Sequence, residues 1–229
     1  MLGLISAMPI EMELLAAELE GSKTEKIGGA VFHVGTLWGH AAVLAVCGPG
    51  KVNAALCAQA MILHYQPEAV INLGVAGSLS EKLDIGNIVI GTFAVQHDMD
   101  TTPLGDPPGF ISGIQLVRLP LSEVLSSKLL TALASLDDIH GMPGGIATGD
   151  QFLHDGNRRA SLRNGFDAIC CEMEGGAVAH VCYVNDTPCA IVRAISDQAD
   201  GSSDIDYPNF VKMAAHNSVR LIKQFLTEK

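Results

Sequence analysis

Short apolar runs alternate with helix-periodic segments along the whole chain, and this alternation constrains the fold more than any other feature. Several runs are apolar at consecutive positions, which is typical of strands buried on both faces. The runs are residues 2–8, 31–37, 41–47, 69–74, 87–95, 145–148, 167–171 and 189–196. The helical segments are residues 10–19, 52–65, 122–136, 157–164, 175–184 and 207–227. The pattern predicts an α/β fold with a largely parallel sheet covered on both sides.

Length, composition and charge narrow the class of protein. A chain of 229 residues is long enough for one sizeable domain, which we expect to span residues 1–229. The net charge of -11 argues against nucleic-acid binding and against an acidic membrane surface. No apolar run approaches the about 20 residues that a bilayer requires, and the N-terminal run resembles a first strand rather than a signal peptide. Six cysteines without a Cys-x-x-Cys pair predict reduced, buried thiols in a cytoplasmic protein.

The α/β prediction also says where a ligand should bind. In such folds ligands bind at the carboxyl ends of the strands, so residues just after a strand are the candidates. Four places qualify: residues 8–11, 74–77, 171–174 and 196–197. The segment from His97 to Gly113 is the one long irregular loop, and loops of that length usually serve function or an interface.

Common ligand motifs are absent or incomplete. Residues 48–51 (Gly-Pro-Gly-Lys) lack the spacing and the hydroxyl residue of a phosphate loop, and residues 74–77 lack the third glycine of a dinucleotide fingerprint. No Gly-x-Ser-x-Gly elbow exists. Residues 97–100 (His-Asp-Met-Asp) are compatible with a metal site, but we favour loop-capping carboxylates. We expect neither a metal nor a cofactor.

Three carboxylates stand at three of the predicted strand ends. Asp197 follows a strand, and Ser196 beside it is placed to orient it; the alternative is an Asp that caps a turn. Glu174 opens a helix, and its alternative is an acidic residue favoured at a helix N-terminus. Glu11 follows the first strand, with Pro9 suited to the first helical position, and taken alone it is better explained as a first-turn carboxylate.

Two further features surround these carboxylates. Gly175 and Gly176 each cost a helix about 1 kcal/mol relative to alanine, which suggests close approach by a ligand or another backbone. Arg193 lies inside an apolar strand and should not be buried unpaired. We therefore predict that Arg193 pairs with Glu172 or Glu174.

Six runs in register carry a family resemblance that covers nearly the whole chain. Together they strongly resemble the 5'-methylthioadenosine/S-adenosylhomocysteine nucleosidases of the nucleoside phosphorylase superfamily. The runs are residues 6–11 (SAMPIE), 48–55 (GPGKVNAA), 74–77 (GVAG), 149–152 (GDQF), 172–175 (EMEG) and 193–197 (RAISD). The implied fold is a phosphorylase-type three-layer α/β sandwich with a central mixed, barrel-like sheet flanked by helices.

The resemblance implies an N-glycosyl hydrolase acting on an adenine nucleoside, with a function in methionine salvage. Cleavage passes through a sugar with oxocarbenium character, so an acid, a ribose ligand and a base for water are required. The resemblance assigns Asp197 as the acid at adenine N7, Glu174 as the ligand of the ribose hydroxyls and Glu11 as the water-activating base.

The resemblance also implies substrate contacts. Phe152 stacks on adenine, the Leu153 backbone reads the base edge, Met173 packs on the ribose and Tyr207 lies near the ribose and its 5' end. The further binding residues are Ala76, Gly77, Glu172, Arg193 and Ser196. The implied assembly is a homodimer in which the loop of residues 101–113 lies near the neighbouring active site.

Departures and alternatives remain. Val75 stands where many members carry a small hydroxyl residue, and Leu104 stands where an aromatic residue is common. The superfamily's phosphorylases hold phosphate with arginines, one of them in the loop after the first strand. Here that loop (Met8-Pro9-Ile10-Glu11) carries a carboxylate instead, which favours water as nucleophile. The alternatives are a hydrolase of another 5'-substituted nucleoside such as aminofutalosine, a phosphate-dependent nucleoside phosphorylase, or a non-enzymatic binding protein.

Overall fold

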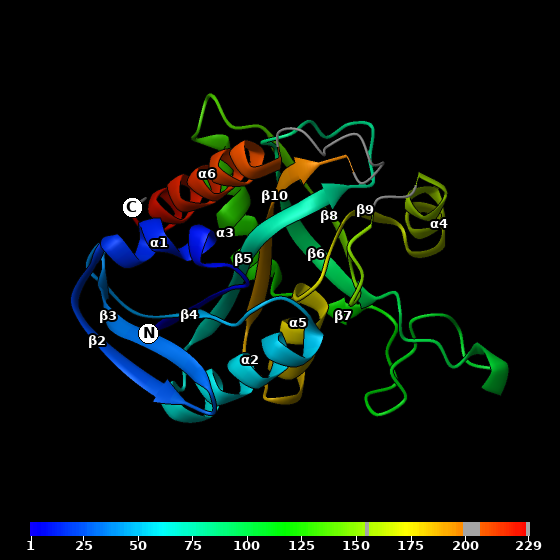
Figure 1. The fold of residues 1–229 in the computed structure, drawn as a ribbon, viewed down its shortest axis with the longest axis horizontal. Coiled ribbons are helices and arrows are strands. Elements are labelled where there is room, and N and C mark those ends of the chain that lie inside the picture. Colours follow the sequence, from blue (N-terminus) through cyan, green and yellow to red (C-terminus); the bar gives the residue numbers. More distant parts are fainter. Residues whose placement is uncertain (154–155, 199–206, 228–229) are drawn as a thin grey trace.

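A sheet that closes on itself organises the fold. The computed structural model describes residues 1–153, 156–198 and 207–227, without the side chains of Tyr207 and Pro208. Strands β5 (Ala69–Ser78), β6 (Ile88–Gln96), β8 (Gly141–Thr148), β9 (Ala168–Glu172) and β10 (Cys189–Asp197) pair in the order β10-β6-β8-β9-β5. Because β10 also pairs with β5, these strands form a closed, barrel-like ring (Figure 1).

The remaining strands extend the sheet away from the ring. Beyond β5 follow β1 (Leu2–Ser6), β4 (His40–Val46), β3 (Ala30–Leu37) and β2 (Leu19–Ile27), while the short β7 (Leu119–Pro120) pairs with β6. The sheet contains parallel pairs such as β1–β5 as well as antiparallel pairs such as β3–β4 and β5–β9. The sheet is therefore mixed, as the family resemblance implies. The largely parallel sheet predicted from the alternation was wrong, because consecutive strands β2, β3 and β4 are joined by turns that reverse the chain.

Helices cover both faces of the sheet. Helices α1 (Pro9–Ala17), α3 (Glu123–Ala134) and α6 (Tyr207–Thr227) pack together on one face, and α2 (Lys51–Tyr65) and α5 (Gly175–Val184) pack on the other (Figure 1). Helix α4 (Gly156–Phe166) lies beside β8 and β9. A separate buried apolar cluster lies under each helical layer, so the structure is a three-layer sandwich.

The predicted helices are all present, with ends that shift by at most two residues. Pro9 opens α1 as predicted, and Met8 is its N-cap. The strand predictions missed β2, whose residues are polar and almost entirely exposed. They also ended β5 too early, because its last residues Gly77 and Ser78 pair with β9.

Two other expectations bear on the site. Residues 97–118 form the long irregular segment, interrupted only by the short 3-10 helix η1 (Thr102–Leu104) and one isolated bridge, and they project from the body (Figure 1). The six cysteines carry free thiols, and all but the partly buried Cys47 are buried. No helix in the described part of the chain is long and apolar enough to cross a membrane.

Candidate active site

A cavity of about 190 Å³ opens where the carboxyl ends of β1, β5, β9 and β10 meet. Every predicted site residue with a described side chain lines it, except Arg193. The lining residues that were predicted are Glu11, Ala76, Gly77, Phe152, Leu153, Glu172, Met173, Glu174, Ser196 and Asp197. The structure thus brings residues from four strand ends and one loop to a single place.

Sequence reasoning did not assign a role to every residue at this cavity. The others that line it are Ala7, Met8, Pro49, Val75, Gln151 and Cys171. Each is a direct neighbour of a predicted position or belongs to a run that carries the family resemblance. Tyr207 was also predicted to bind substrate, but its side chain lies outside the described residues.

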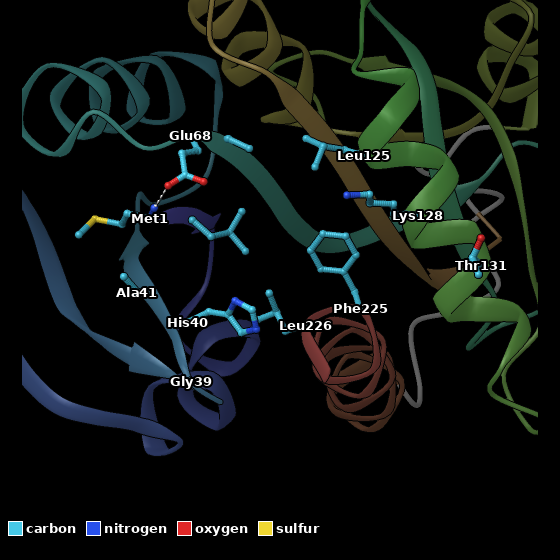
Figure 2. A pocket seen from close by; sticks show the side chains of 12 residues that line it. Met1, Gly39, His40, Ala41, Glu68, Leu125, Lys128, Thr131, Phe225 and Leu226 are labelled. Atoms are coloured by element: carbon cyan, nitrogen blue, oxygen red, sulfur yellow. Dashed lines mark hydrogen bonds and ion pairs between the residues drawn. The ribbon is translucent and has the colours of Figure 1, made fainter. Parts of the chain in front are cut away.

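A larger cavity, of about 850 Å³, lies at the opposite end of the parallel strands (Figure 2). Phe225 and Leu226 of α6 and Leu125 of α3 give it apolar walls, and the Met1 ammonium pairs with Glu68 at its edge. Both the rule for α/β folds and the chemistry of the lining favour the smaller cavity, because that is where buried carboxylates converge.

Glu11 is held by the backbone around it. Its Oε2 accepts hydrogen bonds from the backbone N–H groups of Ala7 (3.1 Å) and Met8 (2.9 Å), and its Oε1 accepts one from Val75 (3.0 Å). Burial raises its pKa above the usual value, although these hydrogen bonds and the nearby Arg193 guanidinium oppose the increase. These three hydrogen bonds from backbone N–H groups fix the orientation of the carboxylate before any ligand binds.

Glu174 occupies the N-cap position of α5. Its Oε1 accepts a hydrogen bond from the backbone N–H of Gly50 at 2.8 Å, across more than a hundred residues of sequence. Burial, followed by repulsion from Glu172, raises the pKa of Glu174 to about 7. A carboxylate with such a pKa changes its charge near neutral pH, as is common among groups at functional sites.

Arg193 is buried and does not line the cavity. The predicted ion pair forms with Glu172, and the guanidinium also donates to the Asn72 side chain. A Cβ at Gly74 would overlap this guanidinium, so glycine is required there. The buried cation offsets part of the charge of the nearby carboxylates Glu172, Glu174 and Glu11, and its ion pair with Glu172 confirms the predicted pairing of Arg193.

Glu172 organises the start of α5. Its Oε2 accepts from the backbone N–H groups of Glu174 (2.9 Å) and Gly175 (2.6 Å), and Thr148 donates to its Oε1. Added Cβ atoms at Gly175 and Gly176 would meet the side chains of Ile191 and Thr148. Side chains packed against the helix start therefore explain the two glycines, and the atoms nearest to them belong to side chains rather than to another backbone.

Asp197 ends β10, and the Ser196 hydroxyl donates to its Oδ2 at 2.9 Å as predicted. Asp197 is only 3% exposed, whereas Phe152 at the mouth of the cavity is 57% exposed. Leu153, next to Phe152, is buried. The cavity therefore combines a buried acidic floor with an exposed aromatic ring at its entrance.

Residues 97–100 were compatible with a metal site. In the described part of the chain, no group of His, Cys, Asp and Glu side chains is arranged to hold a metal ion. Asp100 instead accepts a hydrogen bond from the backbone of Thr102 at 2.9 Å, which is the loop-capping role that we favoured. Asp98 pairs with Lys51 at 2.6 Å.

Comparison with known proteins agrees with this geometry. A family model described as the phosphorylase superfamily matches residues 1–227. A 5'-methylthioadenosine/S-adenosylhomocysteine nucleosidase of Bacillus thuringiensis (strain Al Hakam) is 37% identical over 236 residues, which cover 99% of this chain and 98% of that protein. The chain belongs to the 5'-methylthioadenosine/S-adenosylhomocysteine nucleosidase family of the phosphorylase superfamily. Like the nucleosidases of this family, it is an N-glycosyl hydrolase.

Solved structures of nucleosidases and of a related hydrolase share the fold. The Neisseria meningitidis 5'-methylthioadenosine/S-adenosylhomocysteine nucleosidase, in complex with methylthio-immucillin-A, has a TM-score of 0.95 and 34% identity and covers 100% of this chain and 99% of its own. The futalosine hydrolase of Helicobacter pylori strain 26695 has a TM-score of 0.94 and 32% identity and covers 100% of this chain and 97% of its own. These similar structures are thus named for different substrates: one for 5'-methylthioadenosine and S-adenosylhomocysteine, the other for futalosine.

Proposed function

We propose that the chain hydrolyses the N-glycosidic bond of 5'-methylthioadenosine and S-adenosylhomocysteine, releasing adenine and the 5-thioribose product. The observation that carries the proposal is that Glu11, Glu174 and Asp197, distant in sequence, line one cavity. The 37% identity to a nucleosidase with this substrate pair supports the choice of substrate.

Each carboxylate receives one role. Asp197, oriented by Ser196, protonates N7 so that adenine leaves as a neutral base. Glu174 accepts hydrogen bonds from the ribose hydroxyls, which become more acidic as positive charge develops on the sugar. Glu11 orients and deprotonates the attacking water. Its Oε1 accepts the Val75 N–H with one lone pair, and the second lone pair can accept a water proton.

The surrounding residues hold the substrate. Phe152 stacks on adenine, and the backbone of Leu153 reads the edge of the base. Met173 packs against the ribose. The remaining predicted contacts are Ala76, Gly77, Glu172, Ser196 and Tyr207. Arg193, predicted as a contact too, does not line the cavity and instead supports Glu172 through their ion pair.

The start of α1 favours water over phosphate as the nucleophile. The N-terminus of a helix, with its free N–H groups, is a ready site for an anion. Here the Glu11 carboxylate already accepts the N–H groups of Ala7 and Met8 at that position. A phosphate ion would have to displace this carboxylate and withstand its repulsion.

The test is adenine release from 5'-methylthioadenosine, measured with and without phosphate. We expect equal rates in both buffers. Release that depends on phosphate would establish a phosphorylase, and tight binding without release would establish a binding protein.

A second candidate is a hydrolase of aminofutalosine, favoured by the 32% identity and high structural similarity to a futalosine hydrolase. The three carboxylates would act in the same way, and only the pocket for the 5' substituent would differ. Turnover of 5'-methylthioadenosine, S-adenosylhomocysteine and aminofutalosine, compared as kcat/KM, separates the candidates.

We also propose a homodimer. Val52, Leu56 and Leu63 form an exposed apolar stripe along α2 and are 69%, 61% and 67% exposed. Tyr183 and Val184 at the end of α5 are exposed as well, on a helix that packs against α2. Apolar residues at helical spacing on an exposed face are typical of an interface. In such a dimer the loop of residues 101–113 would lie near the neighbouring cavity.

A further inference from the structure

A partly buried ion pair lies just outside the candidate active site. Lys51 is the first residue of α2, and Asp98 is the second residue after β6. The Lys51 Nζ and Asp98 Oδ1 atoms are 2.6 Å apart, and each side chain is only 19% exposed. Neither residue lines the cavity, and the proposed chemistry gives neither a role.

The pair is part of a closed set of contacts between three segments. Asp98 Oδ2 accepts a hydrogen bond from the backbone N–H of Asp150 at 2.9 Å. Asp150 Oδ1 in turn accepts one from the backbone N–H of Lys51 at 2.7 Å. Burial favours the neutral form of Asp98, but the hydrogen bonds from Lys51 and Asp150 outweigh it and hold its pKa below the usual value. The Asp98 carboxylate is therefore ionised at neutral pH and joins the start of α2 to the loop after β8.

Both joined segments continue directly into the cavity. On one side, Gly50 precedes Lys51 and donates its N–H to Glu174 Oε1 at 2.8 Å. On the other side, the residues after Asp150 are Gln151, Phe152 and Leu153, and all three line the cavity. If either segment moved, a group that faces the ligand would move with it.

A third connection reaches the helix that follows Glu174. Lys51 Nζ donates to Gln96 Oε1 at 3.4 Å, and Gln96 Nε2 donates to the backbone oxygen of Gly176 at 3.4 Å. The ammonium group of Lys51 therefore contacts both the end of β6 and, through Gln96, the first turn of α5.

We propose that Lys51 and Asp98 are positioning residues for the hydrolysis: their ion pair holds the 48–51 and 149–153 segments so that Gly50 reaches Glu174 while Phe152 and Leu153 enclose the base. The inference rests on the proposed function of the same cavity. It assigns a role to the His97–Asp100 segment that differs from metal binding.

The decisive change is Asp98→Asn. The amide keeps the size of the side chain but loses the charge and replaces one acceptor oxygen with an N–H donor, so it cannot serve both Lys51 and the Asp150 N–H. Misplaced binding groups weaken substrate binding, and we expect KM to rise by roughly 10- to 100-fold. Loosening of the Gly50 hydrogen bond also moves the acidic limb of the kcat/KM profile to higher pH, because the ionised form of Glu174 loses a donor.

The matched control is Asp138→Asn. Asp138 forms the doubly hydrogen-bonded ion pair with Arg220, with both N–O distances at 2.7 Å, away from the cavity. We expect KM and the pH profile of this variant to equal those of the wild type. Lys51→Arg, which retains the charge, should keep KM closer to wild type than Asp98→Asn does.

Steady-state kinetics with 5'-methylthioadenosine from pH 5 to pH 9 tests the inference, with thermal melting to confirm that each variant is folded. A folded Asp98→Asn protein with wild-type KM and pH profile overturns it. A fall in apparent kcat alone, in proportion to lost folded protein, also overturns it, because that is the result of a merely structural role.

The wild-type protein is measured first, so that the two proposals fail separately. If the wild type releases no adenine, the proposed hydrolysis is wrong, and calorimetric titration with adenine replaces the kinetic assay. Adenine binding weakened at least tenfold by Asp98→Asn then supports the positioning role. Equal binding by both proteins, or no binding by the wild type, overturns it.

Discussion

Glu174 should destabilise the folded protein above neutral pH, and the substitution Glu174→Gln tests this directly. The carboxylate is 6% exposed, and burial together with the nearby charges of Glu172 and Glu11 raises its pKa, although the Arg193 guanidinium opposes the increase. A pKa raised from 4.5 to about 7 means that ionisation is penalised in the folded state. At 1.36 kcal/mol per pKa unit, the penalty is about 3 kcal/mol.

The pH range of the effect follows from the sign of the shift. Below pH 4.5 the carboxyl group is neutral in both the folded and the unfolded chain, so the penalty is absent. Between pH 4.5 and about 7 the unfolded chain ionises first, and the folded protein loses stability until its own carboxyl group ionises. Glutamine keeps an oxygen that accepts the Gly50 N–H but never ionises, so the variant should not show this loss.

The assay is urea unfolding of wild type and Glu174→Gln at pH 4 and pH 8. We expect equal stability at pH 4 and a gain in the free energy of unfolding of up to about 3 kcal/mol for the variant at pH 8. Adenine release by the variant should be strongly reduced. Glu13→Gln, at an exposed position of α1, is the control and should change stability little at either pH. A Glu174→Gln protein that is less stable than wild type at pH 8, or shifted equally at both pH values, would refute the reasoning.

Further predictions concern other parts of the site and the surface. Asp197→Asn should lower turnover roughly 10²- to 10⁴-fold while 5'-methylthioadenosine still binds, as measured by stopped assays and calorimetry; near-normal turnover would remove Asp197 from the acid role. Glu11→Gln should reduce hydrolysis in the same range, roughly 10²- to 10⁴-fold, and undiminished hydrolysis would contradict its role toward water. Gly74→Ala should displace the Arg193 guanidinium and lower both thermal stability and kcat, whereas a fully active, equally stable variant would show that the close packing is tolerated. Leu56→Glu should convert a dimer into a monomer in light scattering, and an unchanged mass would exclude this face of α2 as the interface.

The sequence predicted the helices well, most clearly α6, whose apolar residues recur at helical spacing, and α1, which begins at Pro9. Helix α3 was predicted to begin at residue 122, and Ser122 is its N-cap, with a side chain that accepts from the Leu125 N–H. Strands that are buried on both faces were equally clear, as for β10, where every residue is buried. The polar strand β2 gave no such signal, because its residues face solvent and its position depends on pairing with β3.

The residues of the candidate site could be predicted from the sequence for a different reason. Its residues follow strands, so the rule for strand ends selected Glu11, Glu174 and Asp197 without knowledge of their distances. The contacts that join separate segments could not be predicted from the sequence. Nothing in the sequence pairs Lys51 with Asp98, or directs the Gly50 N–H to Glu174, because such contacts depend on how the loops pack in three dimensions.

Closure of the ring leaves β2 as an open edge of the sheet, and its composition suits that position. An unpaired strand edge offers free backbone groups to any other strand, which is the route to aggregation. The outer strand reads Leu-Glu-Gly-Ser-Lys-Thr-Glu-Lys-Ile, and its pairing with β3 slips near Gly21, where φ is 63°. A second chain that added to this edge would have to align with an irregular backbone and bring its side chains beside lysine and glutamate. The polar residues that prevented prediction of β2 from the sequence therefore also protect the protein from polymerising through this edge.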